Sequence, residues 1–128
     1  MFVRYVVLFR DEDSHRRMGV LHAADRLRYQ NLFDEHELRH WETLRRWFNM
    51  HMPVPNRFSR SRRPHAHCNA ICWLKSNAVE HSAKLGELAA LLERQGVVTE
   101  VLRTKRPGYI VYEDAYQVAA VPFRDTPG

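Results

Sequence analysis

The sequence has few of the residues that stabilise a secreted protein or carry one into a membrane. It has two Cys, Cys68 and Cys72, which are too few for a disulfide framework, and free thiols fit a reducing cytosol. Near the N-terminus, Arg4 and Arg10 enclose only five uncharged residues. That run is shorter than the apolar core of a signal peptide or a membrane-spanning helix. We therefore expect a cytoplasmic protein that does not enter a membrane.

Several patterns that carry enzyme chemistry are also missing. The five Gly form no phosphate-binding loop, and no Ser stands in a nucleophile elbow. Glu113 and Asp114 are adjacent, so on a strand they would point to opposite faces and make a poor acid–base pair. These absences predict no cofactor. They leave enzymatic activity open but do not favour it.

Acidic residues are absent from the middle of the chain. No Asp or Glu occurs between Glu42 and Glu80, and that stretch holds six Arg and Lys75. The remaining residues carry 13 basic against 15 acidic side chains, although the whole chain has a net charge of +5. The excess of positive charge is therefore a local property that points to an anionic partner.

The chain of 128 residues, 45% of them hydrophobic, is long enough to bury one core. Periodicity and turn residues predict a single α+β domain over residues 1–123 and a frayed tail over 124–128. The element order is β–α–α–β–α–β–β–β, with a mixed or antiparallel sheet packed by helices and a C-terminal meander. The predicted strands are 2–9, 70–75, 97–104, 109–112 and 117–121, and the predicted helices are 15–30, 34–50 and 77–95.

Local signals define the ends of two of these helices. Asp34 with Glu37, and Asn77 with Glu80, have the spacing of a capping box. Gly96 stands where a helix ends in the left-handed conformation. The apolar periodicity predicts a core of Val7, Leu38, Trp41, Leu44, Ile71, Trp73, Leu88, Leu92, Val101, Ile110 and Val118.

Residues 36–40 read H-E-x-x-H and resemble the zincin metallopeptidase motif at its three fixed positions. The resemblance implies that His36 and His40, one helical turn apart, bind zinc while Glu37 activates a water. The extended form with a Gly and a third His is absent. In the first turn of a helix, Glu37 also fits as a capping acid. A zinc-dependent hydrolase is thus one alternative, and a chance match is the other.

A second group of metal-ligating residue types follows the basic stretch. Cys68 and Cys72 have a spacing that metal sites use. In an extended strand, however, His65 and His67 would project opposite to the two thiols. The four side chains converge only if the chain turns there. The alternative is buried thiols beside surface imidazoles.

The segment 57–67 is the strongest candidate binding site. Arg is well suited to phosphate because its planar guanidinium binds two oxygens at once, and an aromatic ring can stack on an unpaired base. We expect an accessory module that binds single-stranded RNA or DNA, or another polyanion. The alternative is a solvated loop whose Arg side chains pair with acidic helix faces. The predicted nucleic-acid-binding residues are Arg57, Phe58, Arg60, Arg62, Arg63, His65 and His67.

A protein-interaction or self-assembling module is a further alternative. The C-terminal meander ends in an edge strand, and exposed edges invite pairing with another chain. Tyr109, Tyr112 and Tyr116 would supply an aromatic contact surface there. The sequence thus leaves open a homo-oligomer formed through the meander edge, or an acidic protein bound by the basic segment.

Overall fold

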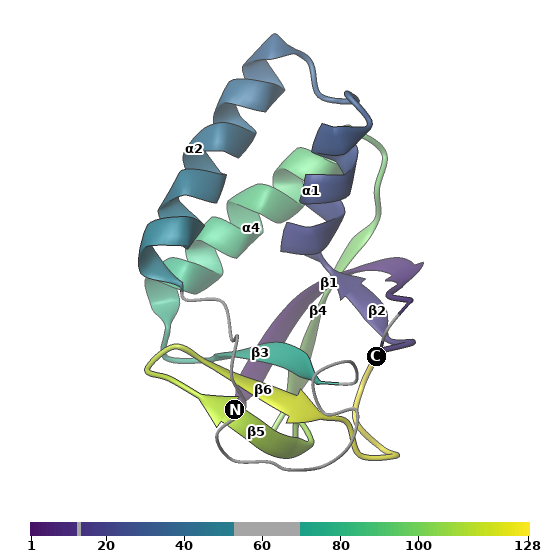
Figure 1. The fold of residues 1–128 in the computed structure, drawn as a ribbon, viewed down its shortest axis with the longest axis vertical. Coiled ribbons are helices and arrows are strands. Elements are labelled where there is room, and N and C mark those ends of the chain that lie inside the picture. Colours follow the sequence, from purple (N-terminus) through teal and green to yellow (C-terminus); the bar gives the residue numbers. More distant parts are fainter. Residues whose placement is uncertain (13, 53–69) are drawn as a thin grey trace.

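Three helices lie over one face of an antiparallel sheet in the computed structural model, which describes residues 1–12, 14–52 and 70–128 (Figure 1). The order of elements confirms the predicted α+β class. The described elements are β1 (Phe2–Arg10), β2 (Arg17–Gly19), α1 (Val20–Tyr29), α2 (Glu35–His51), β3 (Ile71–Lys75), α4 (Val79–Arg94), β4 (Thr99–Thr104), β5 (Tyr109–Glu113) and β6 (Gln117–Val121).

Strand β1 is the centre of the sheet. β4 pairs with it along Phe2–Val7 on one side. Its other side is shared, because β3 pairs with Phe2 and Val3 while β2 pairs from Val6 to Arg10. Beyond β3, the sheet continues through β6 to β5, and every pair is antiparallel.

Two predicted elements differ from the structure. Residues 15–30 were expected to be one helix, but Arg17–Gly19 pairs with β1 and α1 begins only at Val20. The predicted meander is formed only in its β5–β6 hairpin, because β4 pairs with β1. In both cases the segment pairs with β1, which is a tertiary effect that local patterns do not contain.

Of the two predicted capping boxes, one is present in the structure and one is not. Asp34 is the N-cap of α2, and its capping box with Glu37 is complete. α4 begins after Ala78, and no side chain caps its N-terminus, so the box expected from Asn77 is not formed. Gly96 has φ of 80°, as its place after α4 requires.

The core has a large part between helices and sheet and a smaller part made by residues of β1, β3, β4 and β6. Seven of the predicted core residues are buried, and Leu38, Trp41 and Ile110 are half-buried. Val101 is 36% exposed and its neighbour Leu102 is buried instead. Successive side chains of a strand point to opposite faces, so the prediction assigned the wrong face of β4 to the core. The seven buried residues are Val7, Leu44, Ile71, Trp73, Leu88, Leu92 and Val118.

Residues 124–128 are fastened to the start of the chain, although the sequence predicted a frayed tail. Arg16 donates from Nη1 to the carbonyl oxygen of Thr126 at 2.6 Å, and Arg10 donates to that of Gly128 at 3.2 Å. Thr126 is buried, and its hydroxyl accepts a hydrogen bond from the backbone of Phe123. Both bonds go to main-chain carbonyl oxygens, which every residue has. The amino-acid composition of the tail therefore could not predict this contact.

Candidate functional site

The predicted nucleic-acid-binding residues lie outside the described part of the chain. Arg57, Phe58, Arg60, Arg62, Arg63, His65 and His67 all fall within 53–69, as does Cys68 of the second metal-like group. The described chain ends at Met52, which is the C-cap of α2, and resumes at Ala70, directly before β3.

The remaining positive charges of the acid-free stretch are described, and two of them are paired. Arg45 lies 3.5 Å from Asp25, and Lys75 lies 2.6 Å from Glu113. Arg46 is exposed and has no ion pair within the described residues. The acids come from α1 and β5, which are remote in sequence, so the charge available to a ligand is smaller than the sequence count suggests.

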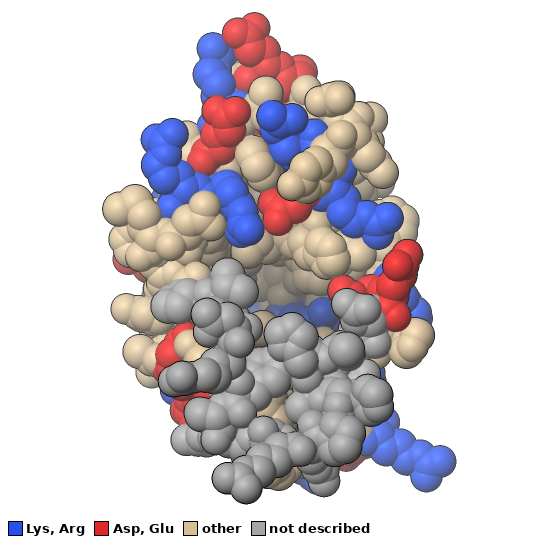
Figure 2. Space-filling model, viewed as in Figure 1, with Lys and Arg blue, Asp and Glu red and all other residues tan. Residues whose placement is uncertain are grey.

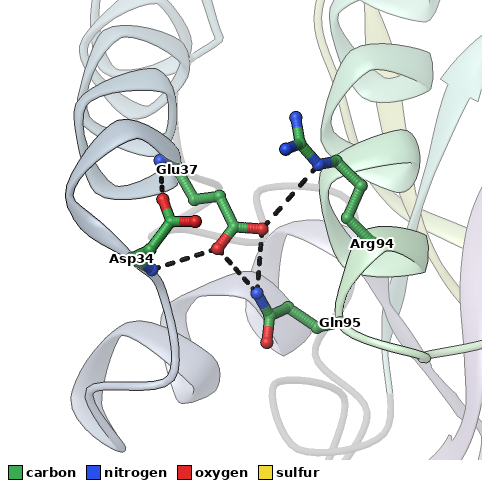
Figure 3. Close-up of polar contacts among 4 residues, drawn as sticks. All are labelled: Asp34, Glu37, Arg94 and Gln95. Carbon is green, nitrogen blue, oxygen red and sulfur yellow. Dashed lines mark hydrogen bonds and ion pairs between the residues drawn. The ribbon is translucent and has the colours of Figure 1, made fainter.

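Glu37 of the H-E-x-x-H segment is a buried structural carboxylate (Figure 3). Its Oε1 accepts from the backbone N–H of Asp34 at 3.0 Å, and its own N–H donates to the Asp34 carboxylate at 2.8 Å. Gln95, the C-cap of α4, donates its amide nitrogen to both Glu37 oxygens at 2.7 and 2.8 Å. Arg94 approaches Oε2 at 3.9 Å. The carboxylate is therefore committed to the contact between α2 and α4.

His36 and His40 lie on a different, open face of α2. They line a shallow depression with Arg39 and Thr43, to which Glu37 does not contribute. His40 approaches Glu87 at 3.7 Å. Among the described residues, no group of three or more His, Cys, Asp or Glu is arranged to hold a metal ion. The helix thus offers two candidate ligands, but the Glu is not placed to act on a water between them.

Arg4 was not singled out by the sequence, yet it is a buried cation. It is 8% exposed, its Nη2 donates to the carbonyl oxygen of Arg17, and its Nη1 has no hydrogen-bond partner among the described residues. Burial lowers the pKa of this guanidinium to about 10, so it stays charged at neutral pH. Within the same described part of the chain, the indole nitrogen of Trp73 is also buried without a partner. The sequence did contain a signal for this buried cation, because Arg4 is the one charged residue inside a strand that is apolar on both faces.

Aromatic side chains gather where α2 ends beside the start of α4. His81 is buried, donates from Nε2 to the carbonyl oxygen of His51 at 2.8 Å, and stacks on Tyr116 at 4.2 Å. Trp47 stacks on the His51 ring at 4.5 Å, and Lys84 lies 5.7 Å from the Trp47 ring centre. These rings pack on one another, which favours a structural role for Trp47 over base stacking.

The three tyrosines of the predicted contact surface differ in how far they are exposed. Tyr109 and Tyr116 are exposed, at 39% and 40%. Tyr112 is half-buried and donates its hydroxyl to Asp114 at 2.9 Å. The same carboxylate accepts from the backbone of Tyr116 and of Gln117, so it organises the β5–β6 turn. A homo-oligomer formed at this edge stays a prediction.

α1 and α4 end side by side, at the upper right of Figure 1. Residues of both helix ends line an apolar groove. We call it the helix-end groove. Its volume is about 440 Å³, within the range of small-molecule sites. The sequence analysis missed it, although both helices are followed by similar tripeptides, Gln30-Asn31-Leu32 and Gln95-Gly96-Val97. The groove is lined by Phe9, Met18, Ala23, Arg26, Leu27, Gln30, Leu32, Leu92, Gln95 and Val97.

Comparisons of the chain with protein-family models, with curated proteins and with solved structures found no match. None of the described helices is both long and apolar enough to cross a membrane.

Proposed function

We propose that the protein binds single-stranded nucleic acid, or a polyanion of similar charge density, through residues 57–67. The observation that carries the proposal is the charge of this segment. Residues 57–63 contain four Arg and no acid, whereas the described residues carry 16 Lys and Arg against 14 Asp and Glu. Several Arg in one short segment can neutralise several phosphates at once, and phosphate contacts supply most of the affinity in non-specific binding.

The rest of the protein is a weaker candidate for a polyanion site. In the view of Figure 2, Lys and Arg are interspersed with Asp and Glu over the helices. Arg17 pairs with Glu100, and Arg39 pairs with Glu35. Charges of both signs at close spacing give no extended positive field. The proposal places the protein in the cytoplasm as a binding module with weak sequence preference, because Phe58 would stack on any base.

Fluorescence anisotropy with labelled single-stranded RNA and DNA oligonucleotides tests this proposal. We expect affinity to fall with salt by about 0.7–0.9 log units per log unit of salt for each phosphate contacted. Changing Arg60, Arg62 and Arg63 together to Ala should weaken binding and flatten this salt slope. We expect the free energy of unfolding to stay nearly constant, because the proposal gives these Arg side chains a role in binding and none in the core.

A matched control removes the same charge elsewhere. Arg103, Lys105 and Arg124 are exposed and form no ion pair within the described residues, so their triple Ala variant should bind as the wild type does. Equal weakening by both variants would mean that only net charge matters. If the wild type binds neither oligonucleotide near physiological salt, the nucleic-acid proposal fails, and an acidic protein becomes the expected partner of this segment.

A further inference from the structure

The helix-end groove is shaped by two helix ends that share one local structure. After α1, the N–H of Leu32 donates to the oxygen of Leu27, and that of Asn31 donates to the oxygen of Arg28. Asn31 has φ of 56°, so these bonds form a Schellman motif. The motif brings the apolar residue after the cap back against the last turn, and both members of this pair, Leu27 and Leu32, line the groove.

The end of α4 repeats this arrangement. The N–H of Val97 donates to the oxygen of Leu92, and that of Gly96 donates to the oxygen of Glu93. Gly96 takes the left-handed conformation that Asn31 takes after α1. The resulting apolar pair, Leu92 and Val97, is a second wall of the groove. Because both walls are fixed by backbone bonds within single helix ends, the groove is formed without a ligand.

Large apolar side chains remain in contact with water at this groove. Phe9 is 58% exposed and Leu32 is 50% exposed, while Met18 and Ala23, which also line the groove, are buried. The last β1–β4 pair joins Val7 to Thr99, so β4 gives Phe9 no cover. Concentrated exposed apolar surface around a hollow is typical of a binding site.

Three polar side chains line the same groove. Arg26 is exposed and makes no ion pair within the described residues. Gln30 is exposed at the C-cap of α1. Gln95 is held in place by Glu37, which takes its amide nitrogen and leaves its amide oxygen without a partner in the described part of the chain (Figure 3). The groove therefore combines apolar walls with one cation and two amides.

The charge of Arg26 decides which head group the groove favours. The two helix C-termini carry partial negative charge, which opposes an anion. However, the Schellman bonds already use carbonyls of both last turns, and Arg26 and Arg94 stand in those turns. A charge-assisted bond from a guanidinium to a carboxylate is stronger than the effect of a capped helix end.

We propose that the helix-end groove binds a small amphipathic carboxylate, such as a medium-chain fatty acid. The guanidinium of Arg26 holds the carboxylate, and the amide nitrogen of Gln30 offers it a further hydrogen bond. The free oxygen of Gln95 is an acceptor, so it takes no part in holding the carboxylate. The alkyl chain covers Phe9 and Leu32. This site is independent of the basic segment 57–67.

Amide chemical shifts, measured by NMR during a titration with sodium octanoate, test the proposal on the full chain. We expect shifts at Phe9, Leu27, Leu32 and Val97 that saturate. Octanol, which lacks the charge, and acetate, which lacks the chain, should each bind at least tenfold more weakly. Arg26→Gln should weaken octanoate binding about tenfold, since a hydrogen bond to a charged group contributes a factor of this order. Leu32→Ser should weaken it as well.

The control variant Arg103→Gln removes an exposed Arg from β4 and should leave octanoate binding unchanged, and thermal unfolding checks that each variant is folded. The proposal is overturned if octanol binds as tightly as octanoate, or if Arg26→Gln and Arg103→Gln behave alike. It is also overturned if the four amides respond to protein concentration and not to octanoate. In that case the groove is covered by a second copy of the chain.

Discussion

The amide nitrogen of Gln95 lies 2.7 and 2.8 Å from the two carboxylate oxygens of Glu37. This contact joins the first turn of α2 to the last residue of α4. It also satisfies a carboxylate that is almost completely buried. One side chain thus fixes two helix ends, and Gln95 in turn lines the helix-end groove.

Replacing Glu37 should therefore destabilise the protein. We expect Glu37→Ala to lower the free energy of unfolding by about 2–4 kcal/mol, because it removes half of a capping box and a buried charged acceptor. Glu35→Ala is the matched control. Glu35 is exposed, and its one ion pair in the described part of the chain is with Arg39 on the same helix, so its loss should cost at most about 0.5 kcal/mol. Urea unfolding of the two variants measures the difference, and similar small losses would contradict a structural role for Glu37.

The capping box should also give a measurable dependence of stability on pH. The backbone N–H of Glu37 lowers the pKa of the Asp34 carboxyl below its usual value of 3.8. A lowered pKa in the folded state means that the stabilisation is present above pH 3.8 and is lost as the pH falls through the lower, folded value. Asp34→Asn keeps a good N-cap without the charge. The variant should lose less stability than the wild type between pH 5 and pH 2.5, and parallel urea-unfolding curves would contradict this assignment.

The buried Arg4 should lower the free energy of unfolding of the protein relative to an apolar side chain at this position. Its guanidinium is buried, and the described residues provide neither an acid to pair with it nor a hydrogen bond to its Nη1. Replacing a buried charge by an apolar side chain of similar length is often stabilising. We expect Arg4→Met to raise the free energy of unfolding by about 1 kcal/mol, with the exposed Arg103→Met within about 0.5 kcal/mol of the wild type. A large loss in Arg4→Met would mean that its bond to the Arg17 carbonyl outweighs the cost of burial.

Zinc should not be bound stoichiometrically by the H-E-x-x-H segment. His36 and His40 supply two ligands, whereas zinc sites use at least three protein ligands. Elemental analysis of protein purified without chelator measures the metal directly. One zinc per chain that is lost in both His36→Ala and His40→Ala would restore the zinc hydrolase interpretation.

Sequence patterns predicted the features that depend on neighbouring residues. The Asp34–Glu37 box and the left-handed Gly96 follow from the chemistry of one helix end each, and both are present. Hydrophobic period and turn residues also placed β5 and β6 as a hairpin. By contrast, β2 has three residues and exists because it pairs with β1. Its own composition does not distinguish it from the helix that follows.

The candidate sites show the same division. The basic segment is visible in the sequence because charge needs no fold to be counted. The helix-end groove needs α1, α4 and the end of β1 to meet, so Arg26 looks like any other Arg of a surface helix. The local sequence signal of the groove is the pair of similar tripeptides at 30–32 and 95–97. These tripeptides predict two helix C-caps, but they do not predict that the two caps meet around a cavity.

The central position of β1 has a consequence for folding. Every strand that pairs with it follows it in the chain, and the pairing of greatest sequence separation joins Phe2 to Thr104, about a hundred residues later. During synthesis, the apolar strand must wait for most of this sequence to emerge before β4 can cover its open edge. Contacts at such separation slow folding, and an uncovered apolar strand is prone to aggregate. Until then only β2, which follows β1 closely, can pair with it, so the edge that β4 will cover stays open on the ribosome-bound chain.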